Sequence, residues 1–367
     1  MLTARGVANN AFRCAFYEAQ DVLADVADVE FIYLKPKKAY KTRLSIQQSI
    51  ISHDVSGKMI SVNVAFQPVE LTKEYDLIVF YLPIWTDLLQ VSAIKQWKKH
   101  CKVSICWLDE LWAANLTRLS SYLSVLNEFD HIVLGMHGTV KAASDILKRT
   151  CHWVPGAIDA IRFNPYPAMP NRVIDIFSIG RIWDDVHRAF MRQVAQKNLF
   201  YVYDTFLASD TQVKDHKKHR EMFAEMVKRS RFFFVAPARM DQDWIINGQI
   251  EFGLRYFEAA AAGAVMIGQA PDCESFKLMF DWPDVVMDMQ SDGSNVSDVL
   301  HLLESQPERL QVISRRNVAE VLLRHDWVYR WEKIFTIAGY DASPGMVERK
   351  NRLKAMAEQI QSLVIQP

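Results

Sequence analysis

Hydrophobic residues along the chain fall into short, nearly continuous runs that are separated by longer amphipathic stretches. The runs are rich in β-branched and aromatic residues, which favour strands; in the first part of the chain they are Val29–Leu34, Tyr75–Leu82, Lys102–Leu108 and His131–Met136. Helical spacing marks the stretches Asn9–Ala27, Leu88–Lys99, Ala113–Phe129 and Thr139–Lys148. Buried strands that alternate with helices are typical of a parallel sheet covered on both faces. The first part of the chain is therefore predicted to be a doubly wound α/β unit.

The opening of this unit is unusual. A doubly wound domain begins with a strand and a glycine-containing turn, whereas the first pattern here is helical, over Asn9–Ala27. Either the opening strand is missing from this version of the chain, or the domain begins on a helix.

The same alternation repeats after a proline-rich connector, Val154–Arg172. Its predicted strands are Ile174–Gly180, Leu199–Tyr203, Arg231–Pro237, Ala264–Gly268 and Asp284–Met287. Its predicted helices are Asp184–Lys197, Lys214–Ser230, Phe252–Ala262, Val296–Leu303, Pro307–Arg324 and Trp327–Ala338. We predict two Rossmann-like domains that face a cleft, over residues 1–153 and 174–338, joined by a linker over 154–173. An amphipathic helix within 339–367, opened by Ser343 and Pro344, is expected to cross back over the cleft.

Composition narrows the function. The 367 residues fit about two domains. Lys and Arg total 43, as do Asp and Glu, so the net charge is +0; this balance predicts no nucleic-acid partner, because phosphate binding needs a clustered cationic surface. The five cysteines and ten histidines form no disulfide framework or metal-binding pattern. Without a long apolar run or a signal peptide, a cytoplasmic location is expected.

One basic run, Lys35–Arg43, lies in the first domain. A solvated loop is the favoured interpretation, because one short cationic tract binds anionic lipid only marginally. Weak peripheral membrane contact stays open as the alternative.

Three strand ends in the second domain carry polar residues where open α/β sheets bind ligands. At the first, Gly180 and Arg181 precede a helix that begins near Asp184. This arrangement suits a diphosphate, because glycine allows a close backbone approach, the helix start offers N–H groups and Arg181 supplies a guanidinium. The same residues are also compatible with an ordinary strand-to-helix turn that carries a surface arginine. The chain contains no GxGxxG and no P-loop, which argues against a dinucleotide-dependent dehydrogenase and a P-loop NTPase.

At the second strand end, Gly253 opens a predicted helix and Arg255 follows. Glu258 lies in an apolar stretch and needs a polar partner; paired sugar hydroxyls and a buried arginine both stay open. At the third, Val235–Gln249 is a long polar loop that contains Arg239 and is either a binding loop or a flexible connection.

These segments resemble the nucleotide-sugar-binding half of GT-B glycosyltransferases over about residues 150–338. VPGAIDAIRFNP is similar to the linker of that superfamily, IDIFSIGR to its phosphate loop, and EFGLRYFEAAAAGAVMIGQ to its donor motif. Within the group 1 glycosyl transferases, the chain is most similar to the spore-maturation-protein branch. Arg255–Gly263 matches the R-x-F-E-A-x-A-x-G pattern of that branch, and His325 and Arg330 match its H-x-x-x-x-R.

The resemblance implies a nucleoside-diphosphate-sugar donor and roles for individual residues. Glu258 would hold the ribose hydroxyls and Arg181 the diphosphate, with Arg188 or His187 as a second cation. Glu251 would contact the donor sugar, although its spacing from Glu258 is one residue shorter than in the family. The implied donor-binding set is Gly180, Arg181, Arg188, Arg239, Glu251, Phe252, Gly253, Leu254, Arg255 and Glu258.

The base of an inverting transfer would come from the first domain, on the acceptor side. CWLDELW follows a strand and supplies Asp109, with Glu110 as alternate; capping of the next helix is the structural alternative. His137 is the other polar candidate, with a helix-start position as its alternative. GT-B enzymes are commonly metal-independent, so the resemblance implies that no metal is needed.

The sequence thus predicts a metal-independent glycosyltransferase that moves a sugar from a nucleotide donor to a saccharide, lipid-linked or protein acceptor. Two alternatives stay open: a nucleotide-sugar epimerase of the same fold, and a non-catalytic protein that binds a nucleotide sugar or a partner.

Overall fold

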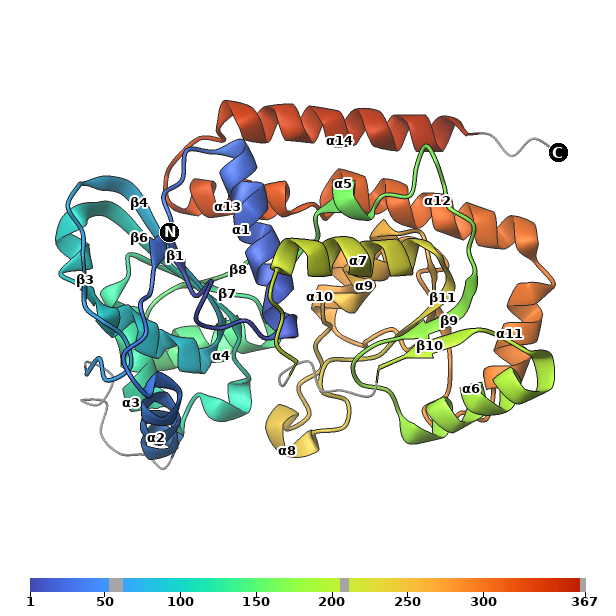
Figure 1. The fold of residues 1–367 in the computed structure, drawn as a ribbon, viewed down its shortest axis with the longest axis horizontal. Helices are drawn as coiled ribbons and strands as arrows, with labels where there is room; N and C mark the ends of the chain where they lie inside the picture. Colours follow the sequence, from blue (N-terminus) through green and yellow to red (C-terminus); the bar gives the residue numbers. More distant parts are fainter. Residues whose placement is uncertain (53–61, 205–210, 364–367) are drawn as a thin grey trace.

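The computed structural model describes residues 1–52, 62–204 and 211–363, and within them two large parallel sheets lie side by side with helices on both faces (Figure 1). The predicted pair of doubly wound α/β units is confirmed. The strands of the first sheet all precede residue 154 and those of the second follow residue 173. The exact domain boundaries stay a prediction.

The first sheet has six parallel strands. In spatial order they are β2 (Ile32–Tyr33), β1 (Leu2–Thr3), β4 (Tyr75–Ile84), β6 (Cys101–Glu110), β7 (His131–Leu134) and β8 (Cys151–Trp153). The opening strand is therefore present, contrary to both explanations offered from the sequence. It is only two residues long, and Leu2 and Thr3 are both buried between β2 and β4. Two residues are too few to show a strand pattern.

The helices around the first sheet are α1 (Cys14–Val26), α2 (Tyr40–Ser52), α3 (Ser120–Leu123) and α4 (His137–Leu147). Short 3-10 segments lie at Ala11–Arg13, Trp85–Ala93, Trp97–His100, Ala113–Asn115 and Ser124–Glu128.

Two predicted helices of this part are wrong. Leu88–Lys99 is interrupted by β5 (Ile94–Lys95), which pairs with β3 (Val69–Glu70). Ala113–Phe129 is broken into three short turns, and the Ser124 hydroxyl donates to the Ser121 carbonyl at 2.6 Å. Serine hydroxyls compete for backbone groups in this way and weaken continuous helices.

The second sheet has five parallel strands, in the order β10 (Tyr201–Tyr203), β9 (Ile174–Ser178), β11 (Ser230–Val235), β12 (Val265–Gly268) and β13 (Val286–Asp288). The longer helices of this part of the chain are α6 (Asp184–Lys197), α7 (His216–Lys228), α9 (Arg255–Ala261), α11 (Val296–Glu304), α12 (Pro307–Arg324) and α13 (Trp327–Ile337). Of these, α13 packs on the first sheet, where Trp331 contacts Tyr81 of β4 and Trp107 of β6. The alternation predicted from the sequence is confirmed here. Three helical turns were not predicted: α5 (Ala160–Phe163), α8 (Asp243–Ile246) and α10 (Glu274–Met279).

The predicted C-terminal helix is α14 (Pro344–Ser362); residues 364–367 of that segment lie outside the described residues. The Ser343 hydroxyl caps it by accepting from the Met346 amide at 3.2 Å. Buried residues such as Leu353 and Ile360 hold α14 against the core, and Figure 1 shows it running along the top of both halves. The helix that crosses back is thus confirmed.

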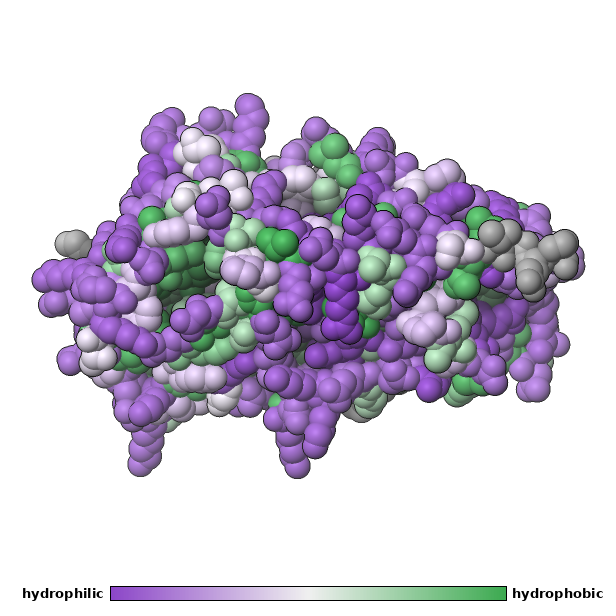
Figure 2. All heavy atoms as spheres, turned by 90° about the horizontal axis from the view of Figure 1, so that it is seen from above, coloured by the Kyte–Doolittle hydropathy of each residue, from purple (hydrophilic) through white to green (hydrophobic). Residues whose placement is uncertain are grey.

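One of the hydrophobic clusters contains residues of both halves, such as Val133 of β7 and Phe233 of β11. Trp107 of β6 lies 5.4 Å from Trp331 of α13, ring centroid to ring centroid, and both are fully buried. Seen from above, the surface is mostly hydrophilic, with hydrophobic residues gathered in a hollow over the N-terminal half (Figure 2). In the described ranges, no helix combines the length and apolar character needed to cross a membrane.

Candidate functional site

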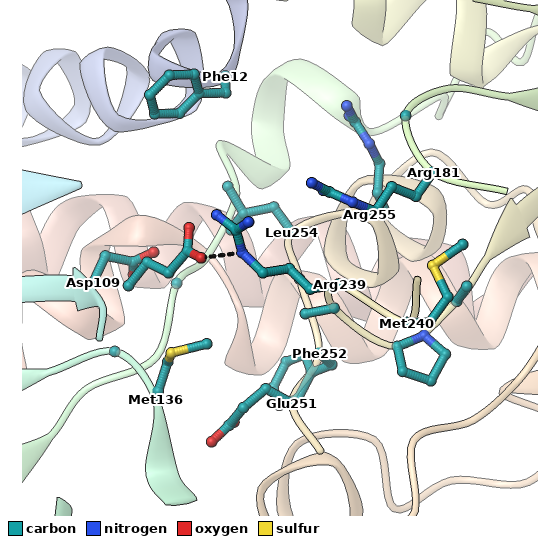
Figure 3. Close-up of a pocket in the computed structure, with 18 of the residues that line it drawn as sticks. Phe12, Asp109, Met136, Arg181, Arg239, Met240, Glu251, Phe252, Leu254 and Arg255 are labelled. Atoms are coloured by element: carbon teal, nitrogen blue, oxygen red, sulfur yellow. Dashed lines mark hydrogen bonds and ion pairs between the residues drawn. The ribbon is translucent and has the colours of Figure 1, made fainter. Parts of the chain in front are cut away.

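A cavity of about 320 Å³ lies between the two sheets, at the carboxyl ends of their strands. One wall comes from the ends of β6 and β7, and the other from the segments after β9 and β11 and the start of α9 (Figure 3). Its volume is at the lower end of the range for small-molecule sites. Strand order in the second sheet reverses between β9 and β11, which is where open α/β sheets bind ligands.

Asp109, near the end of β6, lies on the first wall. Burial raises the pKa of its carboxyl group to about 7, and the nearby carboxylates of Glu110 and Glu251 add to the effect. Gly135 makes room for it: a Cβ atom there would lie 2.5 Å from Asp109 Oδ1. A carboxyl group that titrates near neutral pH is suited to general acid–base catalysis.

Glu110, the next residue, links the two walls. It forms an ion pair with Arg239 of the opposite wall, drawn in Figure 3, and accepts a hydrogen bond from Trp112 Nε1 at 2.8 Å. Arg239 adopts a left-handed backbone conformation with φ of 51°. With its charge compensated, Glu110 is less suited than Asp109 to act as a base.

Three arginines from separate segments line the second wall. Arg181 follows β9 and pairs with Asp241 through Nε at 2.9 Å. Arg239 donates from Nη1 to Gln242 Oε1 at 2.6 Å. Arg255 opens α9 and is discussed below. Guanidinium groups gathered in one cavity are suited to a diphosphate, because they donate charge-assisted hydrogen bonds in a planar fork.

Two glycines of the predicted site also line the cavity. Gly180 has φ of +89°, a left-handed conformation that favours glycine, and its amide donates to the Asp204 carboxylate at 3.1 Å. A Cβ atom on Gly253 would meet nothing within 4 Å, so that the backbone there borders open space. The neighbours Phe252 and Leu254 complete this edge of the cavity.

Glu251 lines the cavity and also contacts the other half of the chain. Its Oε1 accepts hydrogen bonds from the Gly138 amide and from Gln249 Nε2, both at 2.8 Å. Burial raises the pKa of Glu251, although these hydrogen bonds oppose the effect. Gly138 lies in the first turn of α4, where a carboxylate stabilises the helix dipole.

Three residues of the predicted site do not line the cavity. His137 begins α4 and packs its ring 4.8 Å from the Trp153 ring, an arrangement that fits the helix-start alternative. Arg188 lies on the exposed side of α6, where it pairs with Asp185 at 2.6 Å. Glu258 is fully buried and pairs with two arginines, the structural alternative left open by the sequence. These three residues therefore lie outside the cavity lining, and the roles assigned to them from the sequence stay predictions.

His325 and Arg330, which also carried the resemblance, are structural here. Both are buried: Arg330 Nη2 lies 3.1 Å from His325 Nδ1, and Arg330 Nε donates to the Gly156 carbonyl at 3.1 Å.

Sequence reasoning missed the apolar lining of the cavity, including Phe12, Met136 and Met240. Nothing local distinguishes these residues from core residues. It also missed Gln249, whose side chain accepts from the Ala113 amide at 2.9 Å and so joins the two walls. The sequence does contain a local signal for Gly135, because a glycine directly after a buried strand often marks a place where another chain segment approaches closely.

No group of three His, Cys, Asp or Glu side chains within residues 1–52, 62–204 and 211–363 is placed to hold a metal ion.

Comparisons with known proteins bear on the family of the second half of the chain and on the fold. Residues 181–336 match the model of the family described as glycosyl transferase-like. No curated protein matches the chain.

Two similar solved structures are an α-glucosyltransferase in complex with UDP-glucose and DNA containing an abasic site, and an α-glucosyltransferase in complex with UDP and a 13-mer DNA containing a central A:G mismatch. The first is 12% identical with a TM-score of 0.54, and the second 13% identical with a TM-score of 0.52. Each alignment covers 92% of this chain and 98% of the other. The chain therefore has the predicted GT-B fold; the spore-maturation branch stays a prediction.

These complexes correct one expectation. The balanced charge led to the prediction of no nucleic-acid partner, but both similar structures contain DNA. The exclusion was wrong, because net charge sums over the whole chain and does not describe how cations are distributed over a particular surface.

Proposed function

We propose that this chain is a cytoplasmic, metal-independent glycosyltransferase that moves a sugar from a nucleoside-diphosphate-sugar donor to a hydroxyl acceptor. The observation that carries the proposal is a single cavity in which Asp109 lies on one wall and Arg181, Arg239 and Arg255 line the other. The glycosyl transferase-like match over residues 181–336 and the GT-B fold support it.

Each wall would have its own task. The arginines hold the diphosphate and stabilise the negative charge that develops as it leaves, which preorganised donors do without a metal. In a direct displacement, Asp109 takes the proton of the acceptor hydroxyl as that oxygen bonds to the sugar carbon. A pKa of about 7 leaves a substantial fraction of Asp109 ionised at neutral pH while keeping it basic.

Saccharides, lipid-linked sugars and proteins are the acceptors expected from the resemblance. DNA joins them as a class to test, because the similar α-glucosyltransferases were solved with DNA. UDP is the first nucleotide to try for the same reason.

The donor site is tested by calorimetric titration of the purified protein with UDP, ADP, GDP, CDP and TDP, in EDTA and in Mg²⁺. We expect one nucleotide to bind with equal affinity in both buffers. Arg181→Gln should weaken that binding about 10- to 100-fold, since a hydrogen bond to a charged group contributes about 1.5–3 kcal/mol. Arg192→Gln, an exposed arginine on α6, is the matched control.

Binding of no nucleotide by the wild type would refute the donor site, and a requirement for Mg²⁺ would refute metal independence. Release of the nucleoside diphosphate from its sugar during multiple turnover with an acceptor then separates a transferase from the alternatives. Binding without release would leave an epimerase or a non-catalytic protein.

A further inference from the structure

Arg255 lines the cavity, and its ion-pair partner Glu258 is itself bonded to the buried Arg220. Its Nη1 donates to Glu258 Oε2 at 2.6 Å, while its side chain remains 34% exposed on the cavity side. Glu258 Oε1 accepts from Arg220 Nη1, also at 2.6 Å. The two oxygens of one buried carboxylate are thus divided between an arginine in the cavity and an arginine outside it.

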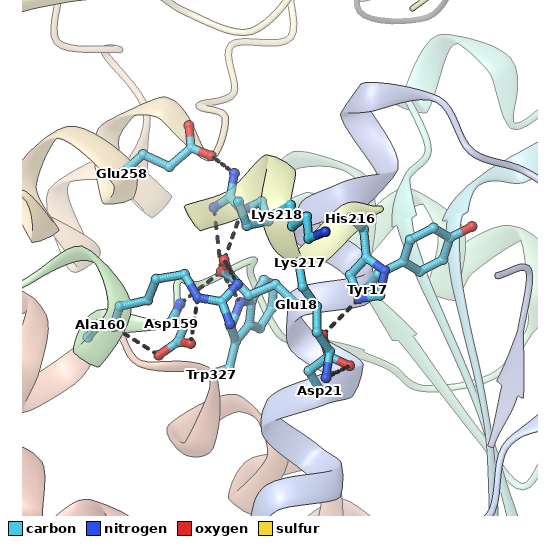
Figure 4. A network of polar contacts seen from close by, with 12 residues as sticks. Tyr17, Glu18, Asp21, Asp159, Ala160, His216, Lys217, Lys218, Glu258 and Trp327 are labelled. Atoms are coloured by element: carbon cyan, nitrogen blue, oxygen red, sulfur yellow. Dashed lines mark hydrogen bonds and ion pairs between the residues drawn. The ribbon is translucent and has the colours of Figure 1, made fainter. Parts of the chain in front are cut away.

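Arg220, on α7, also forms an ion pair with Glu18 of α1. Arg220 Nε donates to Glu18 Oε2 at 2.8 Å, and Glu18 Oε1 accepts from the Asp159 amide at 2.9 Å and from Trp327 Nε1 at 3.2 Å. Figure 4 shows Glu18, Asp159 and Trp327 converging on this point, with Glu258 on the far side. Glu18 and Arg220 are nearly inaccessible to solvent, so neither contacts a ligand.

The charges alternate along the row Glu18, Arg220, Glu258 and Arg255. Burial alone raises the pKa of Glu258, but Arg255 and Arg220 outweigh it and hold that pKa below its usual value. The two guanidinium groups also share an aromatic support, because Arg255 and Arg220 lie 5.0 and 5.4 Å from the Phe223 ring centroid. The row therefore keeps Glu258 ionised and fixes the orientation of Arg255.

Because Arg220 and Arg255 share the carboxylate of Glu258, the way in which Arg255 can bind an anion in the cavity changes. An arginine that meets a free carboxylate forms two parallel hydrogen bonds with it. Arg220 occupies Oε1, which limits the contact of Arg255 to Oε2. Further N–H groups of Arg255 are then left for an anion in the cavity, since a guanidinium has five.

We propose that Arg220 is a positioning residue for phosphate binding: it occupies one oxygen of Glu258, backed by Glu18, and so keeps Arg255 directed at the diphosphate. Glu258 acts as the counter-ion of Arg255 rather than as the ribose ligand that the family resemblance implies. This inference rests on the proposed function, because it assumes a diphosphate in the cavity.

Inorganic pyrophosphate and UDP together separate the two roles of Glu258, because pyrophosphate has no ribose. If UDP is not the nucleotide that binds, the nucleoside diphosphate found in the titrations takes its place. Glu258→Gln should weaken both probes by the same factor, several-fold or more, if it orients Arg255. A loss confined to the nucleotide would overturn the proposal in favour of a ribose ligand.

A double-mutant cycle tests Arg220 directly. Arg255→Gln should weaken pyrophosphate binding about tenfold or more, and Arg220→Gln severalfold. In the Arg255→Gln background, Arg220→Gln should have less than a twofold further effect on affinity, although it still lowers the melting temperature. A purely structural role would lower stability without this non-additivity in affinity, since non-additivity reports that the two residues act together.

A control variant and a second substitution of Arg220 accompany the double-mutant cycle. Arg229→Gln removes a half-exposed arginine that directly follows the same helix, and it should change the affinity for neither pyrophosphate nor the nucleotide. If Arg220→Gln does not fold, Arg220→Lys retains the charge without the planar fork, and we expect a loss of at least threefold for both probes.

Affinity equal to wild type in a folded Arg220 variant would overturn the inference, as would a full additional loss in the Arg255→Gln background. Failure of the wild-type protein to bind pyrophosphate or any nucleoside diphosphate would instead refute the proposed function.

Discussion

Replacement of Asp109 by asparagine should make the protein more stable above neutral pH and at the same time remove its catalytic base. The pKa of Asp109 rises from 3.8 to about 7 on burial beside Glu110 and Glu251. Each pKa unit corresponds to about 1.4 kcal/mol, so keeping this group ionised in the folded protein costs on the order of 4 kcal/mol. An asparagine side chain at this position would have almost the same shape and no charge.

The sign follows from linkage. Because the pKa of Asp109 is higher in the folded state than in the unfolded state, its carboxyl group binds the proton more tightly in the folded protein. The associated stability is fully present below about pH 4 and is lost as the pH rises through 7. The stability of Asp109→Asn relative to wild type should therefore grow by up to about 4 kcal/mol between pH 4 and pH 8.5.

Urea unfolding of both proteins at a series of pH values measures this difference, since the other titrating groups are common to both. Asp145→Asn is the matched control, because it makes the same substitution at a side chain that is 69% exposed. A difference that does not change between pH 4 and pH 8.5 for Asp109→Asn would refute the burial argument.

The same variant tests catalysis. Loss of a general base slows proton transfer typically by 10²–10⁴-fold, so nucleotide release in the presence of acceptor should fall by about that factor. Nucleotide affinity should change little, because Asp109 lies on the wall opposite the arginines. Release at the wild-type rate would remove Asp109 from the mechanism.

Two further substitutions test the structure around the site. Gly135→Ala places a Cβ atom 2.5 Å from Asp109 Oδ1 and 2.7 Å from its carbonyl oxygen. We therefore expect the free energy of unfolding in urea to fall by about 1–3 kcal/mol. An unchanged urea midpoint would contradict this packing. Asp87→Asn leaves Arg13 without its buried partner, whose two hydrogen bonds measure 2.9 and 3.0 Å. A destabilisation of about 3–5 kcal/mol is expected from thermal or urea unfolding, and less than 1 kcal/mol would show that the pair is not buried as described.

Much of the fold follows from sequence periodicity. Strands such as Tyr75–Ile84 and Ser230–Val235 are apolar along most of their length, and each is followed by a helical or turn segment that ends in another strand. This alternation has few solutions other than parallel sheets covered by helices. The wrong assignments, Leu88–Lys99 and Ala113–Phe129, are segments in which strand pairing or serine side chains competed with a helical pattern.

Part of the candidate site could likewise be predicted from the sequence. The sequence by itself located Gly180, Arg181 and Asp109, because the carboxyl ends of parallel strands meet at one edge of a sheet and residues just after a strand must lie there. The identity of these side chains then indicated an anion site and an acid–base group.

Only the tertiary structure decided the partners of the buried charges. Glu258 pairs with Arg220, 38 positions away, and Glu251 caps a helix 113 positions away. Local sequence fixes the period of a helix or strand, but a buried carboxylate is satisfied by whichever distant element packs against it. Glu258 therefore looked equally suited to ribose and to arginine until α7 was placed beside α9.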